Sequence, residues 1–359
     1  MEQMWWNHII KAHKFLEDIV AAAAGGSSIL VSLPVYVPWK NTLIDIVSDR
    51  LRMENSKNKI DVITCPTDKP GFFLLNRYCK EEIRAKYRYG VSYAEFLGKC
   101  QETVLNDRYI WVSDIPAAKI DEWIEFVTEY TKGVKNKTPG IFVLEVHDNA
   151  AVARKTKKGM QNIIFDHNIG AYDKYAFCTL ASSGTKCKEY LRPYLAELVS
   201  SLCGDDVELC AACVAEGAEF LEMPYEVIQK LVKEAFRSDG ERYSFTKSKT
   251  DVEVFIWEAQ LKYIFPLVES YRKYFILQYN DAIKAVLPIS NSYGEVVNMP
   301  EDVEIGTLLY LVNKGDITIS PQEYTDLKFY RDTRNRLAHM KPLSNKDVNA
   351  ILKAGKHEG

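Results

Sequence analysis

Residues 29–41 of the chain read ILVSLPVYVPWKN. The apolar run 29–33 follows the breakers GGSS at 25–28, a pattern typical of a buried strand in a parallel sheet. Residues 42–53 predict a helix after the loop. A buried strand, a loop and a helix in this order indicate an α/β domain in which helices cover both faces of the sheet.

The loop has the spacing of a P-loop, G-x-x-x-x-G-K-[ST], in which backbone N–H groups and a lysine hold phosphates. Lys40 stands where that lysine stands, but Pro34 and Trp39 replace both glycines and Asn41 replaces the magnesium-binding hydroxyl. Proline removes an N–H donor, and a tryptophan prevents the backbone from wrapping closely around a phosphate. The sequence therefore leaves ATP binding open, but argues against a normal grip and against turnover.

Further apolar runs alternate with helical patterns over residues 1–185. They predict three more strands and one or two others, at 60–64, 109–114 and 141–146, then 162–165 and 175–178. Strands that alternate with helices predict a three-layer α/β sheet.

Two polar residues end these runs. Asp114 closes the run 109–114 as the carboxylate of a Walker B strand does, although in front of Pro116 it could instead cap the next helix. His147 follows 141–146, where an AAA+ protein carries its polar sensor residue. In order and spacing, this part resembles a degenerate AAA+ or STAND-type P-loop domain. The alternative is another doubly wound domain that binds no nucleotide. The resemblance implies a remnant nucleotide pocket that senses rather than hydrolyses, lined by Lys40, Asn41, Asp114 and His147.

The rest of the chain is predicted to be helical. Residues 186–236 read as three or more helices, as in the helical lid of AAA+ proteins, and the polar stretch 237–250 reads as a linker. Residues 251–359 predict a bundle of four or five helices, with 287–300 as a loop. The expected domains are thus 1–185, 186–236 and 251–359, with 237–250 between the last two.

A second motif lies late in this bundle, where residues 330–339 read YRDTRNRLAH. Arg334 and His339 are five residues apart, so on a helix their side chains point roughly 140° from each other. Histidine exchanges protons near neutral pH and arginine is a permanent, fork-shaped cation. Such a pair can cleave RNA without a metal, with the 2′-OH as internal nucleophile, if a second surface closes the site.

This stretch resembles the Arg-Asn-x-x-Ala-His form of the R-x4-6-H motif of HEPN domains, many of which are ribonucleases of prokaryotic defence and toxin systems. The resemblance implies His339 as acid or base, Arg334 on the phosphate, and Asn335 holding the strand or a helix contact. It also implies a homodimer with two motifs facing each other, RNA as substrate, a 2′,3′-cyclic phosphate product and no required metal or cofactor. The alternative is a structural helix whose histidine caps or packs.

Net charge is -3, so RNA contact would depend on a local basic patch. Beside Arg334 that patch is predicted to contain Arg331, Arg336 and Lys341. No apolar run is long enough for a bilayer, and the eight scattered cysteines suit reduced thiols, so we expect a cytoplasmic protein with no membrane partner.

Three functions fit these patterns. The first is an RNA-cutting effector whose N-terminal domain senses a trigger. The second is a non-catalytic scaffold that assembles with defence-system partner proteins. The third is a working NTPase with an unusual loop, in which Lys40 would be essential.

Overall fold

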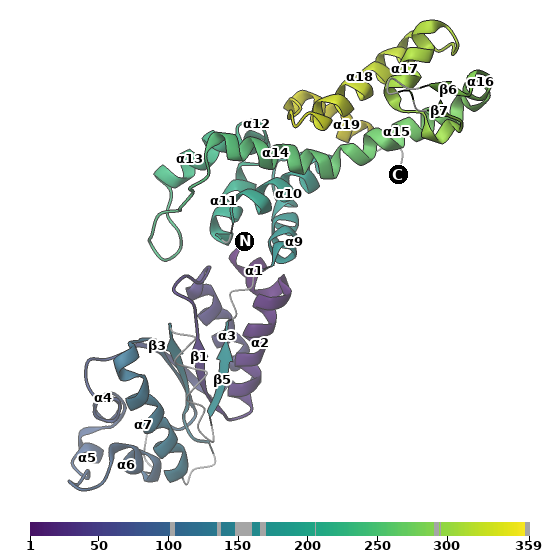
Figure 1. Ribbon diagram of the computed structural model, residues 1–359. Helices are drawn as coiled ribbons and strands as arrows, with labels where there is room; N and C mark the ends of the chain where they lie inside the picture. Colours follow the sequence, from purple (N-terminus) through teal and green to yellow (C-terminus); the bar gives the residue numbers. More distant parts are fainter. Residues whose placement is uncertain are drawn as a thin grey trace. The chain divides into compact units, whose positions relative to one another are not determined.

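The computed structural model describes residues 1–100, 105–134, 138–147, 160–165, 170–204, 206–290, 294 and 296–355 (Figure 1). The chain divides into two compact units. Unit 1 comprises Met1–Phe177 and Phe236–Glu241, and unit 2 comprises Cys178–Ala235 and Arg242–Gly359. The domain boundaries expected from the sequence are finer than this division and stay predictions.

Unit 1 is built on a five-stranded sheet in which every pairing is parallel. Its strands, in the order β2-β3-β4-β1-β5 across the sheet, are β1 (Ser28–Ser32), β2 (Lys59–Thr64), β3 (Arg108–Ile115), β4 (Ile141–Val146) and β5 (Met160–Ile164). All residues of β1 and β4 are buried, which explains why these strands are continuous apolar runs rather than alternating ones.

Helices cover both faces of this sheet (Figure 1). One face packs against α1 (Glu2–His8), α2 (Ile10–Ala24) and α3 (Lys40–Glu54), and the other against α4 (Pro70–Tyr78), α6 (Tyr93–Lys99) and α7 (Ile120–Gly133), with the short α5 (Glu81–Arg84) beside them. This architecture fits the predicted α/β P-loop-like domain. The strand expected at 175–178 is wrong, because these residues lie inside helix α9 (Ala171–Ser182). A four-residue apolar run is compatible with either structure.

The strand order decides which loops meet. Since β3, β4 and β1 are neighbours and parallel, their carboxyl ends lie at one edge of the sheet. Ligands of open α/β sheets bind at that edge. Asp114 lies at the end of β3, and the loops that carry Pro34 and His147 leave from the same edge.

Unit 2 consists mainly of helices. They are α10 (Arg192–Leu202), α11 (Val207–Glu216), α12 (Ala218–Glu222), α13 (Pro224–Glu234), α14 (Lys249–Tyr263), α15 (Phe265–Gln278), α16 (Asn280–Val286), α17 (Ile305–Lys314), α18 (Pro321–Ala338) and α19 (Asn345–Gly355). A hairpin of β6 (Ile289–Ser290) and β7 (Val296–Val297) stands where the sequence predicts only a loop. The bundle is therefore helical but not purely α.

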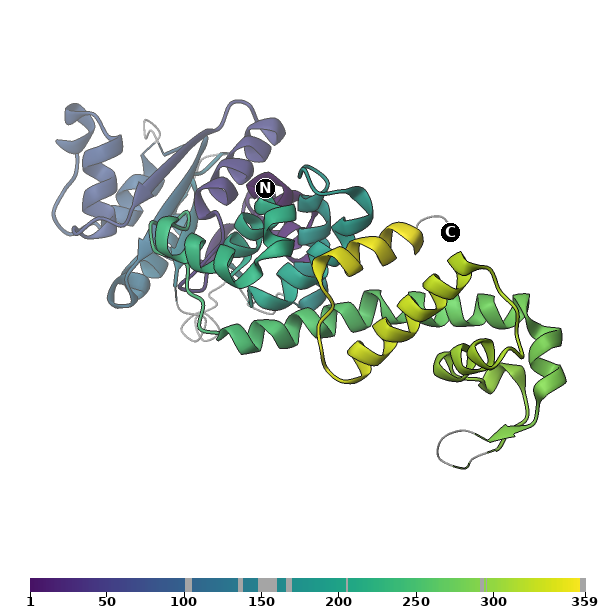
Figure 2. The same cartoon turned by 90° about the horizontal axis from the view of Figure 1, so that it is seen from above.

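Helix α18 lies along α14 and α15 within unit 2 (Figure 2). Leu327, Thr333 and Leu337 are its buried residues, and Tyr330 stacks on Tyr271 of α15 with ring centroids 4.0 Å apart. The helix begins at a capping box on Ser320. One side of α18 is thus fixed in the bundle, and none of its charged residues is buried.

None of the described helices combines the length and the hydropathy that a membrane span requires.

Candidate functional sites

In the loop after β1, the residue at the second glycine position of the P-loop spacing has a backbone conformation that favours glycine. Trp39, at the second glycine position, has φ 47°, in the left-handed region that favours glycine. Its side chain is only 7% exposed and packs against Phe177, and its carbonyl accepts a hydrogen bond of 3.2 Å from the indole of Trp6. The loop is therefore anchored in the hydrophobic core by the residue that replaces the glycine.

Lys40 is the first residue of α3 and points at two carboxylates. Its Nζ lies 2.8 Å from Oδ1 of Asp114 and 3.0 Å from Oε1 of Glu145. Asp114 has φ 56° at a break in the β3–β4 register, a bulge that turns its carboxylate toward this edge. Lys40, selected from the P-loop spacing, and Asp114, selected as a carboxylate at a strand end like that of Walker B, thus meet in the folded chain.

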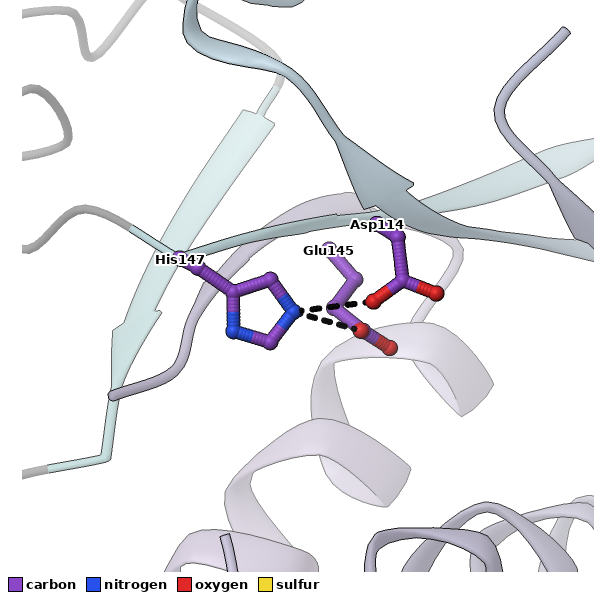
Figure 3. A group of neighbouring side chains, drawn as sticks. All are labelled: Asp114, Glu145 and His147. Atoms are coloured by element: carbon purple, nitrogen blue, oxygen red, sulfur yellow. Dashed lines mark hydrogen bonds and ion pairs between the residues drawn. The ribbon is translucent and has the colours of Figure 1, made fainter. Parts of the chain in front are cut away.

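His147, the third predicted residue, bridges the same two carboxylates (Figure 3). Its Nε2 lies 3.1 Å from Oδ1 of Asp114 and 3.2 Å from Oε1 of Glu145. Its Nδ1 lies 3.0 Å from the carbonyl oxygen of Pro34. A carbonyl only accepts, so Nδ1 carries a hydrogen. The bond to Glu145 is the main cause that raises the pKa of His147 to about 9, against the opposing effect of burial.

Glu145 completes the cluster, and the sequence analysis did not select it. Its side chain is 0% exposed and its Oε2 accepts a 2.8 Å hydrogen bond from the indole of Trp111. A single charged residue within the fully buried strand β4 is a signal that could have identified it, because a buried carboxylate requires partners.

The four ionisable groups neutralise one another. Burial opposes the charge of Lys40, but its bonds to Asp114 and Glu145 outweigh burial and raise its pKa. Burial likewise opposes the charges of both carboxylates, yet the bonds from Lys40 and His147 lower the pKa of each. Two cations and two anions leave no surplus positive charge for a phosphate.

A cavity of about 390 Å³ opens beside this cluster. Its lining includes Ser238 and Asp239, which the sequence analysis placed in a linker. The Oγ of Ser238 accepts a hydrogen bond of 3.2 Å from the backbone N–H of Trp39, and the Arg237 guanidinium lies over the ring of Tyr36 at 4.4 Å. The full lining is Val35, Val37, Lys40, Asn41, Asp114, His147, Ser238 and Asp239.

The second predicted site lies at the end of α18. Nη2 of Arg334 donates a 2.8 Å hydrogen bond to Oε2 of Glu304, and the Arg334 side chain is 33% exposed. His339 follows the last helical residue and is exposed, with its backbone N–H bonded to the carbonyls of Asn335 and Arg336. No side chain in the described part of the protein bonds to the His339 imidazole.

The other predicted RNA-binding residues are arranged around this end. Arg336 donates a 2.6 Å hydrogen bond to the carbonyl of Pro342, and Lys341 is exposed. Arg331 is half-buried and pairs with Asp332 at 3.2 Å. The basic patch is therefore partly used for internal contacts.

Helix α14 holds the turn that follows α18. The indole of Trp257 donates a 2.7 Å hydrogen bond to the carbonyl of Leu337, two residues before His339. The buried amide of Gln260 accepts from the backbone N–H of Leu343 at 2.7 Å and donates to its carbonyl at 3.3 Å. These two residues, which the sequence analysis did not select, fix the backbone on both sides of His339 and Lys341.

No family model matches the chain, and no curated protein matches it. Among solved structures it is similar to a variant of Thermotoga maritima RuvB, with 13% sequence identity, a TM-score of 0.35, and coverage of 88% of this chain and 93% of that chain. A likeness at that score supports no argument about function. The fold assignment of unit 1 depends on its own sheet.

Proposed function

We propose that unit 2 is a metal-independent HEPN-type endoribonuclease of a prokaryotic defence or toxin system, regulated by a P-loop-like unit 1 that does not turn over ATP. The observation that carries the proposal is the placement of Arg334 and His339. Arg334 lies near the end of α18, whose other side is buried, and His339 directly follows the last residue of the helix and is exposed to solvent.

The chemistry follows from RNA itself. The 2′-oxygen attacks the adjacent phosphorus, the bond from phosphorus to the 5′-oxygen breaks, and a 2′,3′-cyclic phosphate remains. One imidazole accepts the proton of the 2′-OH and another gives a proton to the leaving 5′-oxygen. In a homodimer with facing motifs, the two copies of His339 supply both roles, and Arg334 neutralises the charge that grows on the phosphate.

Substrate preference follows from the same geometry. The reaction needs a splayed nucleotide whose 2′-oxygen lies in line with the leaving oxygen, which single strands and loops allow and a duplex does not. Arg336 and Lys341 are close in sequence to His339 and would contact neighbouring phosphates, and Asn335 would hold the strand.

A second candidate is the scaffold function, in which the chain assembles with partner proteins and cuts nothing. It is favoured by the mutual neutralisation of Lys40, Asp114, Glu145 and His147, and by the pairing of Arg334 with Glu304. Both sites then serve as structural ion pairs.

Cleavage of single-stranded RNA by the purified full-length chain, in EDTA, with and without ATP, separates the two. The test compares wild type with Arg334→Ala and His339→Ala, and uses Lys328→Ala, an exposed lysine of α18 outside the patch, as the matched control. We expect the wild type and Lys328→Ala to leave cyclic-phosphate ends, and both site variants to lose about 100-fold or more in rate. If all four proteins are equally inactive while the wild type forms a stable oligomer, the scaffold function replaces the nuclease.

A further inference from the structure

Three potential metal ligands of unit 1 converge at the carboxyl edge of the sheet. The ligand atoms of Asp114, Glu145 and His147 all lie within 4.8 Å of one another, and the imidazole Nε2 lies 3.1 and 3.2 Å from the two carboxylate oxygens (Figure 3). An ion with bonds of about 2.1 Å to nitrogen and oxygen has neighbouring ligands about 3.0 to 3.4 Å apart. These two spacings fall in that range before any ion is bound.

Groups outside the cluster orient two of the ligands. The carbonyl of Pro34 accepts from Nδ1 of His147, which directs the other ring nitrogen toward the carboxylates. The indole of Trp111 donates to Oε2 of Glu145, which directs Oε1 toward the same point. Metal sites use such outer bonds to fix the tautomer of a histidine and the orientation of a carboxylate.

The same point already holds a cation. The Lys40 ammonium contacts the very oxygens that His147 contacts, Oδ1 of Asp114 and Oε1 of Glu145. Lys40, Asp114 and His147 line the cavity of about 390 Å³, and Glu145 is buried behind them, so an ion can enter from the cavity and the ammonium has space to withdraw into it.

We propose that Asp114, Glu145 and His147 bind one first-row transition-metal dication, such as Zn²⁺ or Mn²⁺, which displaces the ammonium of Lys40 and the proton on Nε2 of His147. One imidazole and two carboxylates suit these ions, whereas Mg²⁺ prefers oxygen ligands and water. The site lies in unit 1 and is separate from the proposed metal-independent cleavage, so its test requires no RNA.

Titration of the EDTA-stripped full-length chain with Co²⁺, followed by visible absorption and by competition with Zn²⁺ and Mg²⁺, tests the site. We expect one Co²⁺ per chain, displaced by Zn²⁺ and not by Mg²⁺. Glu145→Gln and His147→Gln should weaken binding at least about 10-fold, because loss of a single ligand has that effect or more. His13→Gln, a surface histidine beside Glu17, is the matched control and should bind as the wild type does.

Lys40→Met keeps all three ligands and removes the competing ammonium, so it distinguishes a metal site from an ion-pair cluster even where the ligand variants fold poorly. We expect it to bind Co²⁺ several-fold more tightly than the wild type, and Co²⁺ to raise its Tm. Absence of Co²⁺ binding, binding that the ligand variants do not change, a thiolate charge-transfer band, or weaker binding by Lys40→Met would each overturn the proposal.

Discussion

The edge of the sheet in unit 1 and the end of α18 in unit 2 both combine a histidine with a basic side chain. The two sites differ in how far these groups are paired with carboxylates and buried. In unit 1, the charges of Lys40 and His147 meet Asp114 and the fully buried Glu145. In unit 2, no carboxylate of the described residues bonds to the exposed His339, and Arg334 meets Glu304 at the surface.

Burial explains why the difference matters. In a low-dielectric interior each charge depends on its partner, and removal of one leaves the others unpaired at a large cost. At the surface, water compensates each group, so a pair contributes little to stability and exchanges partners readily. The first arrangement is suited to holding a fixed cation, and the second to meeting a polyanion that arrives and leaves.

The largest expected effect is that of removing the buried carboxylate. Glu145→Ala leaves Lys40 and His147 with only the half-exposed Asp114, so we expect the unfolding free energy of unit 1 to fall by about 3 to 5 kcal/mol. Urea denaturation followed by tryptophan fluorescence measures this free energy, because five of the six tryptophans lie in unit 1 and only Trp257 lies in unit 2.

Asp18→Ala is the matched control for that measurement. It removes an exposed carboxylate paired with Lys14 on α2, and should cost at most about 0.5 kcal/mol. A Glu145→Ala protein as stable as the control would show that the cluster is not held together by buried charge.

The next effect is a pH dependence of the unfolding free energy of unit 1, measured in EDTA. The folded-state pKa of His147 is about 9, above the ordinary value of 6.5. The stability that protonated His147 contributes is therefore fully present below pH 6.5 and is lost as pH rises toward 9. We expect a loss on the order of 2 kcal/mol between these values. Urea midpoints measured at pH 6, 7.5 and 9 test this, and the same series with His147→Gln should lose this part of the slope. An equal slope in both proteins would assign the titration to another group.

The sequence predicted much of the frame around this cluster. Strand β4 matches its predicted range of 141–146 residue for residue, because breakers bound a run that the sheet buries on both faces. Asp114 and His147 lie at or just after the carboxyl ends of β3 and β4. Lys40 begins the helix that follows the loop after β1, and its side chain reaches the same edge.

What the sequence did not reveal depends on contacts between distant segments. Neither the burial of Glu145 nor its bond to Trp111 follows from a local pattern, and Ser238 reaches the loop of Trp39 across 199 residues of chain. In α18, Arg334 and His339 were selected from a motif. The partner of Arg334, Glu304, is placed by the packing of α17 on α18 and could not be read from that motif. The roles of Arg334 and His339 stay predictions until cleavage is measured.

A smaller effect should come from the residue that holds the turn of His339. Trp257→Phe keeps an aromatic ring but removes the N–H bonded to the Leu337 carbonyl, a loss of about 1 kcal/mol. Because a displaced imidazole is a poorer acid or base, we expect kcat for RNA cleavage to fall about 10-fold with little change in KM. Steady-state kinetics and a melting curve measure both. A purely structural role would lower Tm and leave kcat per folded protein unchanged.

The smallest effect on stability, and the sharpest test of the contrast, concerns Glu304. Glu304→Gln removes the surface carboxylate bonded to Arg334, so stability should change by less than about 0.5 kcal/mol. The freed guanidinium should bind a short single-stranded RNA a few-fold more tightly at low salt, with the gain disappearing as salt is raised. Fluorescence anisotropy in a His339→Ala background, where the RNA stays intact, measures it.

Glu301→Gln, an exposed carboxylate of the preceding turn, controls for the change in net charge alone. The double variant Arg334→Ala with Glu304→Gln isolates the pair, because the gain should vanish once the guanidinium is absent. If Glu304→Gln binds RNA no better than Glu301→Gln, Arg334 does not meet the phosphate. The end of α18 would then be an ion pair serving structure, like the cluster of unit 1 but without its burial.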